Sequence, residues 1–357
     1  MLYDVRWKAF LVKFACACVI FYSAFQISRN RIVQSFSQQG DTQNDMKIET
    51  LAEGRNIERR KKETNLSHAF TFVDNKWKLT KLCKPYTFFV HNRDFPLSKY
   101  TSNAGTVNIF THDVKKDGIS AVINRTGAFE VKTINRILYE LELDKQLNLI
   151  DIGTNVGQHC LAAALIGRDS IAIDAAEANI EHVCASAHYL NLGRKITLIH
   201  NIISDNHEKH DFRYSKGGDY GSVDVDSDGI WDRMKKQYDG YFQKYTIPQN
   251  SVTLNDLLDL PQIHRFKKAF IKMDVEGHEH RVLLGAREFF KRIDVHGIVM
   301  EWAWHVKRPS ANIIKSIMKE FKFKPFLMHQ KSESPLKLEM SDNWPQDVLW
   351  LPIKYLN

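Results

Sequence analysis

Three acidic residues near the ends of two predicted strands form the densest set of groups that could do chemistry. Asp274 and Glu276 stand in the run Lys272-Met-Asp274-Val-Glu276-Gly277, and Glu301 ends the next apolar run. Carboxylates grouped in this way can orient a substrate hydroxyl, remove its proton or hold a divalent cation. Alternatively, Glu276 and Glu279 only offset a helix dipole, but that does not explain an acid at the end of a strand. We therefore expect Asp274, Glu276 and Glu301 to act on a substrate.

A glycine-containing turn between a predicted strand and a predicted helix could bind the other reactant. The stretch Leu147–Cys160 passes from apolar residues through an acid and two glycines into a helical pattern, with Asp151, Gly153, Asn155 and Gly157 at the turn. Glycines let the backbone come close to a ligand, and the amides at the start of a helix face it. Because two glycines of a dinucleotide fingerprint are missing, a pyrophosphate fits poorly. An uncharged or zwitterionic ligand such as S-adenosylmethionine fits better, and a plain strand–helix connection is the alternative.

The acid at the end of the second predicted strand, Asp174, could complete this ligand site. A carboxylate at this place in a nucleotide-binding sheet can accept both hydroxyls of a ribose, and a solvated acid at a strand end is the alternative. No metal site is predicted. His278 and His280 are better explained as supporting or surface groups than as metal ligands. The calcium-like run Asp224–Gly229 has Lys235 where its twelfth position needs a glutamate.

The elements that must position these residues alternate between strand and helix, as in a parallel sheet covered by helices. Short apolar runs predict strands at 86–91, 106–111, 147–151, 170–174, 196–203, 269–274, 295–301, 323–328 and 348–351. Helical spacing of apolar residues predicts helices at 130–142, 178–192, 279–291 and 313–321. The polar stretch from 205 to 250 is predicted to be a functional lid or an insertion.

The first 66 residues predict a membrane anchor followed by a flexible stem. Residues 14–25 are uncharged and apolar, and the run from 10 to 27 suits a thin membrane if Lys13 turns towards the head groups. We expect a cytoplasmic tail and signal anchor over 1–27 and a polar stem over 28–66. A cleaved signal peptide, a mitochondrial presequence and a buried helix are the alternatives. The sequons Asn65-Leu-Ser67 and Asn124-Arg-Thr126 favour a single-pass protein of the Golgi or endoplasmic reticulum with a lumenal catalytic part.

Composition limits the classes of partner. The chain has 50 Lys and Arg residues against 42 Asp and Glu residues, and this modest surplus is spread along the sequence. No basic stripe interleaved with aromatic residues is present, so we expect no nucleic-acid partner. Outside the apolar segment, Cys83, Cys160 and Cys184 predict no disulfide framework. Cys160 and Cys184 are expected to be small buried hydrophobic residues on helices.

Several motifs in order resemble the FkbM family of S-adenosylmethionine-dependent methyltransferases. The motifs lie between about 147 and 302. Leu149–Gly157 is similar to the family's Asp-x-Gly-Ala-Asn-x-Gly opening, and Ile271–Gly277 is similar to its Lys-Ile-Asp-Val-Glu-Gly signature. The other matching segments are Ile199–Asp205, Ser251–Leu258, Val282–Ala286 and Glu301. The resemblance implies methyl transfer to oxygen, commonly on a sugar or small metabolite. It also implies that Ser204 binds the cofactor. Many members have Phe-Glu-Pro at the end of the second strand, where this chain has the shorter acid in Asp174-Ala175.

Together these features predict an α/β protein with a Rossmann-like, doubly wound methyltransferase sheet, preceded by a membrane anchor and a polar stem. Residues 67–146 are expected to form an α/β preamble and residues 147–357 the FkbM-like domain. The residues predicted to bind S-adenosylmethionine are Asp151, Gly153, Asn155, Gly157, Asp174 and Ser204. Asp274, Glu276 and Glu301 are predicted to act on a hydroxyl of a glycan or small molecule; a divalent cation is compatible with these acids but not indicated. A non-catalytic lumenal binding protein is the competing hypothesis, and a nucleic-acid methyltransferase is disfavoured because its Asn/Asp-Pro-Pro-Tyr and Pro-Cys motifs are absent.

Overall fold

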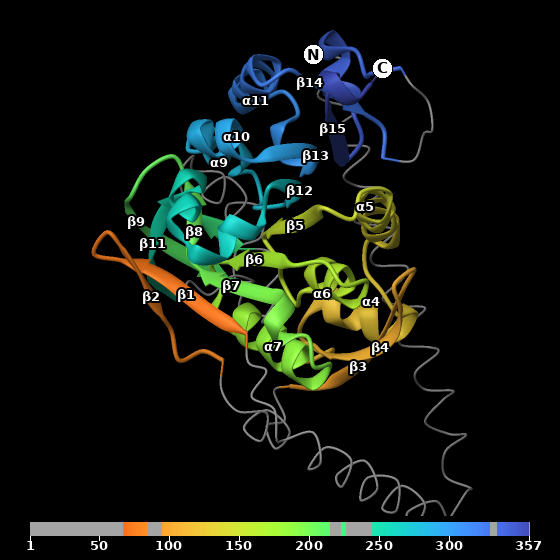
Figure 1. Cartoon of the computed structure of the whole chain (residues 1–357), viewed down its shortest axis with the longest axis vertical. Helices are drawn as coiled ribbons and strands as arrows, with labels where there is room; N and C mark the ends of the chain where they lie inside the picture. The colour runs from red at the N-terminus through yellow and green to blue at the C-terminus, as the bar shows by residue number, and fades with distance from the viewer. Residues whose placement is uncertain (1–66, 84–94, 215–222, 226–244, 329–333, 357) are drawn as a thin grey trace, which may run out of the picture. The chain divides into compact units, whose positions relative to one another are not determined.

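The computed structural model describes residues 67–83, 95–214, 223–225, 245–328 and 334–356 (Figure 1). All elements described below belong to the unit Asn65–Asn357. The predicted anchor and stem, the sequon at Asn65 and the predicted strand at 86–91 lie outside the described residues. Among the described residues, no helix combines the length and apolar character needed to cross a membrane.

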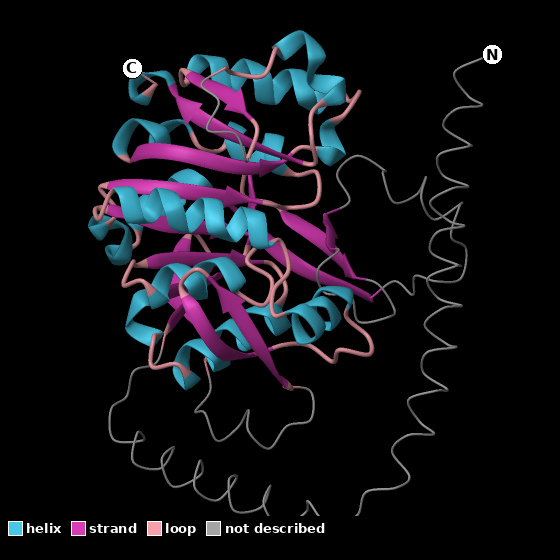
Figure 2. Cartoon of the chain, turned by 90° about the vertical axis from the view of Figure 1, so that its right-hand side faces the viewer, coloured by secondary structure: helices cyan, strands magenta, loops and turns pink. Residues whose placement is uncertain are grey.

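A large, mostly parallel sheet forms the centre of the described part of the chain (Figure 2). Its strand order is β14-β15-β13-β12-β5-β6-β7-β1-β2. The bounds are β1 His68–Val73, β2 Lys76–Leu79, β5 Leu147–Ile152, β6 Ser170–Asp174, β7 Ile196–His200, β12 Lys268–Met273, β13 Asp294–Glu301, β14 Phe323–Phe326 and β15 Asp347–Pro352. The strands from β13 to β1 run parallel, and antiparallel strands flank them. From β5 the chain adds β6 and β7 on one side, and later it adds β12 and β13 on the other side of β5. This reversal between β5 and β12 is the switch point of a doubly wound sheet, as predicted.

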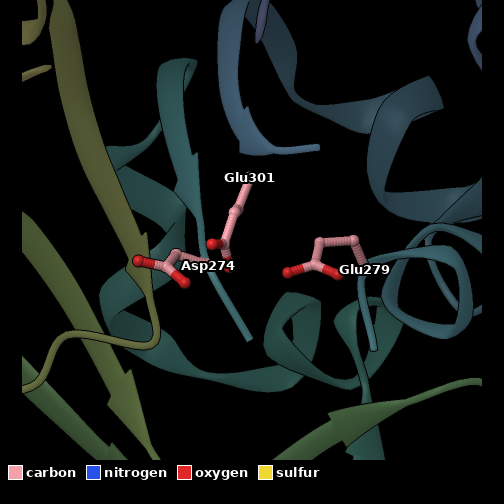
Figure 3. A group of neighbouring side chains, drawn as sticks. All are labelled: Asp274, Glu279 and Glu301. Carbon is pink, nitrogen blue, oxygen red and sulfur yellow. The ribbon is translucent and has the colours of Figure 1, made fainter. Parts of the chain in front are cut away.

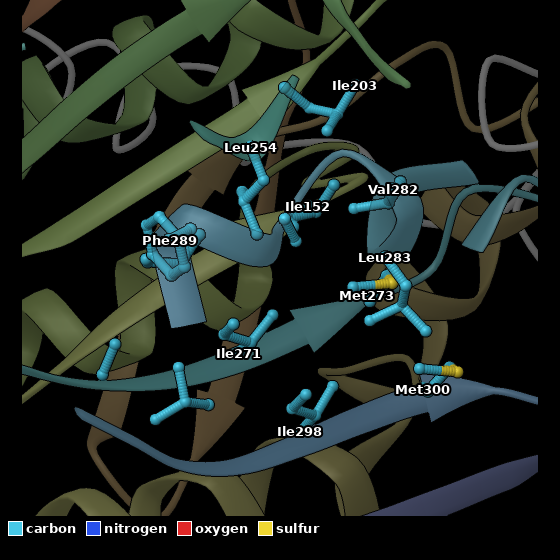
Figure 4. Close-up of a cluster of buried hydrophobic side chains, with 14 of the residues drawn as sticks. Ile152, Ile203, Leu254, Ile271, Met273, Val282, Leu283, Phe289, Ile298 and Met300 are labelled. Carbon is cyan, nitrogen blue, oxygen red and sulfur yellow. The ribbon is translucent and has the colours of Figure 1, made fainter. Parts of the chain in front are cut away.

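Helices cover both faces of this sheet (Figure 1). Their bounds are α4 Gly118–Thr126, α5 Val131–Leu143, α6 Gln158–Leu165, α7 Glu177–Tyr189, α9 Glu279–Leu284, α10 Arg287–Arg292 and α11 Pro309–Glu320. Short 3-10 helices are η1 Gly193–Lys195, η2 Leu254–Asp259, η3 Pro261–Arg265, η4 Ala303–His305, η5 Leu338–Asn343 and η6 Ile353–Tyr355. Neighbouring residues of β12 face opposite layers: Phe270 packs among residues of α5 to α7, whereas Ile271 and Met273 pack against α9 and α10 (Figure 4). Burial on both faces explains why these strands are almost continuously apolar.

The polar stretch after the third predicted strand is partly strand, not only a lid or insertion loop. A four-stranded sheet in the order β10-β9-β11-β8 consists of β8 Ile202–Ser204, β9 Lys209–Tyr214, β10 Val223–Val225 and β11 Tyr245–Thr253. The predicted strand 196–203 is therefore divided into β7 and β8. Asn201 lies between them, and its side chain bonds to the backbone of Phe72 and Asn250. These side-chain bonds compete with the regular ladder and end β7.

The predicted helix 279–291 is also divided, into α9 and α10. The break lies at Gly285, where an added Cβ would be only 2.3 Å from the carbonyl oxygen of Ser204. The chain therefore comes into backbone contact with β8 at this point, which helical periodicity alone does not reveal.

Residues 67–146 are joined to the main sheet and to α7. β1 pairs in parallel with β7, while β3 Leu97–Ser102 and β4 Gly105–Phe110 form a separate two-stranded sheet. Cys83 forms a disulfide with Cys184 of α7, so the prediction that Cys184 is an unbonded hydrophobic residue is wrong. Cysteine spacing could not show that two residues 101 positions apart meet in the fold. Cys160 is free and buried, as predicted.

Candidate active site

A cavity of about 450 Å³ lies at the carboxyl ends of the central parallel strands. The turn after β5, the end of β6, the turn after β12 and the end of β13 contribute to its walls. The predicted site residues that line it are Gly153, Asn155, Asp174, Asp274, Glu276 and Glu301. Asp151, Gly157 and Ser204 are not among its described lining residues. The fold thus brings six of the nine predicted residues to one cavity, across the switch point between β5 and β12.

Gly153 and Gly157 are required first of all by packing between elements. Both have left-handed backbone, with φ +78° and +85°. A Cβ on Gly153 would lie 1.8 Å from the carbonyl oxygen of Asp274, and a Cβ on Gly157 would lie 2.8 Å from Val183 of α7. The sequence-based reason for these glycines was close approach to a ligand. The structure adds a requirement that holds even without a ligand.

Asn155 and Asp174 connect the turn after β5 to the end of β6. Asn155 has a left-handed backbone with φ 50°, and its N–H donates to Asp174 Oδ2 at 2.9 Å. Asp174 Oδ1 accepts hydrogen bonds from the N–H of Ala176 at 2.8 Å and from Asn179 Nδ2 at 3.1 Å. Burial raises the pKa of Asp174 to about 6, although these hydrogen bonds favour its charged form. Asp174 therefore shapes the cavity and also presents a carboxyl group to it.

Asp151 and Ser204 support the walls of the cavity from behind. Asp151 is fully buried, and its Oδ2 accepts hydrogen bonds from Thr154 Oγ1 at 2.7 Å and from the N–H of Cys160 at 3.2 Å. Ser204 is also fully buried, and its hydroxyl lies 3.1 Å from His278 Nε2. His278 and His280 were predicted to be either supporting groups or surface groups. Both are buried, so they are not surface groups.

Lys272 is the cationic centre of the cavity wall. It is buried, and its Nζ donates to the carbonyl oxygen of Gly153 at 2.8 Å and lies 3.2 Å from Asp274 Oδ2. Burial disfavours its charge, but Asp274, Asp151 and Glu130 raise its pKa above the ordinary value. Burial likewise opposes the charge of Asp274, but Lys272 and a hydrogen bond with Glu301 hold the pKa of Asp274 below its ordinary value. Asp274 is therefore a stable carboxylate and a weak proton acceptor at neutral pH.

Glu301 and Glu276 complete the acidic wall. Burial and the nearby charges of Asp274 and Glu276 raise the pKa of Glu301 far above its ordinary value, so it is protonated at neutral pH. Glu276 lies in the sharp turn after β12 with a left-handed backbone at φ 56°. Strained backbone of this kind is concentrated at functional sites.

Two further residues of the cavity were not found from the sequence. Glu130 precedes α5 with φ 53°, and burial raises its pKa to about 7 despite the charge of Lys272. His159 of α6 is buried, with its Nε2 3.7 Å from Glu130 Oε2 and without a hydrogen-bond partner among the described residues. Glu130 was assigned to a helix that should pack on the sheet. No motif marks its left-handed conformation, which turns it towards the cavity.

Comparison with known proteins identifies the domain. Residues 151–325 match the family described as Methyltransferase FkbM domain. This chain carries an FkbM methyltransferase domain. No curated protein matches the chain.

Solved structures similar to the methyltransferase domain share little sequence with it. Precorrin-6y C5,15-methyltransferase from Geobacter metallireducens is 12% identical, with a TM-score of 0.33, over 63% of this chain and 89% of that chain. An S-adenosylmethionine-dependent O-methyltransferase from Thermotoga maritima is 11% identical, with a TM-score of 0.34, and the match covers 80% of this chain and 91% of that chain. An O-methyltransferase from Bacillus cereus is 10% identical, with a TM-score of 0.30, and the match covers 66% of this chain and 96% of that chain. These values are too low to indicate a substrate.

The enzyme is an S-adenosylmethionine-dependent methyltransferase, and its cavity fits that cofactor. A volume of about 450 Å³ lies within the range of small-molecule sites. His159 is one of the lining residues, and its buried Nε2 has no hydrogen-bond partner among the described residues, as is found for polar groups that bind a ligand or an ordered water. The carboxyl group of Asp174 lies at the strand end where ribose hydroxyls are bound in nucleotide-binding sheets.

Proposed function

We propose that the methyltransferase domain transfers the methyl group of S-adenosylmethionine to a hydroxyl oxygen of a glycan or small metabolite, on the lumenal side of a secretory-pathway membrane. The cavity is the observation that supports this proposal most. It joins the turn after β5 and Asp174, on one side, to Asp274, Glu276 and Glu301, on the other. Both reactants would therefore meet at the switch point of the sheet.

The chain's own residues supply alignment and proton transfer. When bound, S-adenosylmethionine supplies an electrophilic methyl group on a sulfonium. Gly153, Asn155 and Asp174 would hold that cofactor, and Asp274, Glu276 and Glu301 would orient the acceptor hydroxyl. Among the acids of the cavity, Glu130 has a pKa of about 7, which suits a group that takes a proton at neutral pH. Asp274, held charged beside Lys272, is better suited to orientation.

Two observations support a lumenal catalytic part. Disulfides form and persist in oxidising compartments, and Cys83 is bonded to Cys184. The sequon residue Asn124 is exposed on α4, where an oligosaccharide could be attached. The apolar run at 10–27 would supply the membrane anchor. Golgi and endoplasmic reticulum are both compatible with these features.

Methyl transfer can be tested with the full chain in detergent. Calorimetry should show binding of S-adenosylmethionine, and labelled cofactor should transfer its methyl group to members of a panel of glycan and small-molecule acceptors. Asp274→Asn should bind the cofactor nearly normally and lose about a hundredfold in turnover, because the acceptor hydroxyl would lose the carboxylate that orients it. Glu339→Gln, an exposed substitution outside the cavity, is the matched control. Cofactor binding with no transfer to any acceptor would instead favour the non-catalytic alternative.

Topology can be tested separately in sealed microsomes. A lumenal domain should be protected from added protease and should shift in size after glycosidase treatment. The Asn124→Gln variant separates the sequon on α4 from the one at Asn65. Full protease sensitivity together with no glycosidase shift would exclude the lumenal assignment.

A further inference from the structure

Three carboxyl groups converge beside the cavity (Figure 3). Asp274 follows β12, Glu301 ends β13 and Glu279 begins α9. One oxygen from each lies within 4.8 Å of the others. Ligand oxygens at 2.3–2.6 Å from one calcium ion can be at most about 5 Å apart, so this spacing fits a single hard cation.

Glu301 lies against the carboxyl group of Asp274 inside the protein, and the two groups interact directly. The residue is 91% buried; apart from this contact with Asp274, Oε2 accepts no hydrogen bond from the described residues, and Oε1 accepts a long one from Gln346 Nε2 at 3.4 Å. Figure 3 shows its carboxyl group placed between those of Asp274 and Glu279. Two buried carboxyl groups in contact cannot both carry an uncompensated charge, so they either share a proton or bind a cation together.

Glu279 is oriented towards the cluster by fixed neighbours. It is fully buried, with Oε1 accepting from the N–H of Val275 at 2.9 Å and Oε2 lying 2.7 Å from His305 Nε2. His305 is itself held by Ser310 Oγ, 2.8 Å from its Nδ1. Carboxylates that bind metals are commonly held by such hydrogen bonds, which fix the direction of the ligand oxygen.

The local charges favour an added cation. Glu276 lies close enough to act electrostatically on Glu301, so four acidic groups share this corner of the cavity. Lys272, beside Asp274, and His305, beside Glu279, are the basic groups paired with them. We infer that Asp274, Glu279 and Glu301 bind one hard divalent cation, of the Ca²⁺, Mg²⁺ or Mn²⁺ class.

Binding of this cation does not depend on the acceptor, but its role rests on the proposed function. A cation at Asp274 would lie at the wall where the acceptor hydroxyl is proposed to bind. There it would make the hydroxyl more acidic and orient it towards the methyl group. Methyl transfer should then be lost on chelation and restored by the same cation.

The experiment uses the full chain in detergent, freed of metal with a chelator and dialysed. Ca²⁺, Mg²⁺ and Mn²⁺ are titrated separately by calorimetry, without cofactor or acceptor. At least one cation should bind saturably with one site per chain. Glu301→Gln should weaken that binding at least tenfold, and so should Asp274→Asn, whereas the exposed Glu339→Gln should bind as the wild type does.

Two results would overturn the inference. The first is no saturable binding of any of the three cations to the wild-type chain at several millimolar, beyond the weak end of calcium sites near ~10⁻³ M. The second is unchanged binding in folded Glu301→Gln and Asp274→Asn, which would mean that the acids share a proton and the cation binds elsewhere. If methyl transfer fails, the cation titration can still be interpreted, because it contains neither cofactor nor acceptor.

Discussion

Glu130 carries two features that oppose folding. Its backbone lies in the left-handed region at φ 53°, and its carboxyl group is largely buried. Each feature destabilises the native state, and such features are concentrated where a function requires them. Both place an acid opposite Lys272 at the cavity. The residue was therefore hidden from sequence reasoning, which follows favourable local patterns.

Glu130→Gln should make the protein more stable, and increasingly so as the pH rises. The pKa of Glu130 is about 7 in the folded protein against 4.5 ordinarily, so the stability it contributes is present below pH 4.5 and is lost as the pH rises to 7. Glutamine removes that loss, and the gain over wild type should be roughly 1–3 kcal/mol larger at pH 8 than at pH 4.5. The variant and the wild type have the same charged and titratable groups around position 130, so these groups do not account for the difference. They are Lys272, Asp274, Asp347, Asp151 and His159.

Urea unfolding at the two pH values measures this difference. Glu142→Gln, at an exposed position of the same region, is the control and should show little change. A difference between Glu130→Gln and wild type that is the same at both pH values would show that the buried charge of Glu130 does not limit stability.

Gly153→Ala should destabilise the fold itself. The added Cβ would overlap the carbonyl oxygen of Asp274 and would require a side chain at φ +78°. We expect a loss of about 3 kcal/mol or more in the free energy of unfolding. Gly118→Ala, where nothing lies within 4 Å, should change it by less than about 1 kcal/mol. If Gly153→Ala is fully stable and only cofactor binding is lost, the glycine is needed for the ligand alone.

The turn after β5 and the strand β12 depend on each other through Lys272. This side chain is buried between them, bonds to the carbonyl oxygen of Gly153 and compensates the charge of Asp274. Parallel pairing alone sets β5 beside β12, but the lysine fixes how their two ends meet.

Lys272→Met should be strongly destabilising, because it leaves buried carboxylates without their cation. We expect a loss of about 3–5 kcal/mol in the free energy of unfolding. The double variant Lys272→Met with Asp274→Asn should recover part of that loss. Chemical denaturation of both variants and of Asp274→Asn alone gives the coupling energy, and strictly additive losses would argue against the pair.

At the level of elements, the periodicity of apolar residues predicted the strands and helices whose positions depend on burial of one or both faces. The strands at 170–174 and 295–301 and the helix at 130–142 agree with β6, β13 and α5 to within about a residue. The breaks at Asn201 and Gly285 could not be predicted, because each depends on a backbone contact made by a distant segment. The strands at 209–214 and 245–253 lie in a polar stretch without clear alternation. The candidate site was predictable where a motif follows a strand, and it was missed at Glu130, where no motif exists.

For the molecule as a whole, the bond between Cys83 and Cys184 connects the segment that follows β2 to α7, a helix that packs on the central sheet. The loop that it closes spans 101 residues. A cross-link over a loop of this length stabilises by restricting the unfolded chain, by up to about 4–5 kcal/mol in the simple entropic account. The folded domain should therefore be sensitive to reduction.

Reduction should lower the melting temperature of the wild-type chain. The double variant Cys83→Ser with Cys184→Ser should melt at a similarly lowered temperature, with a loss of about 2–5 kcal/mol, and should not respond to reductant. Melting curves with and without reductant check this. Equal melting of oxidised and reduced wild-type protein would show that the bond adds no stability.

The contact between Gly153 and the backbone of Asp274 has a consequence for the evolution of such domains. A descendant that stopped methylating would still need this glycine, because a larger residue would force two neighbouring strand ends apart. Selection for a folded protein would therefore preserve the recognisable part of the motif long after the activity was gone. In such lineages Glu130 and Glu301, whose burial the fold tolerates at a disadvantage, would be free to change first, and their loss would mark an inactive relative better than the glycine turn does.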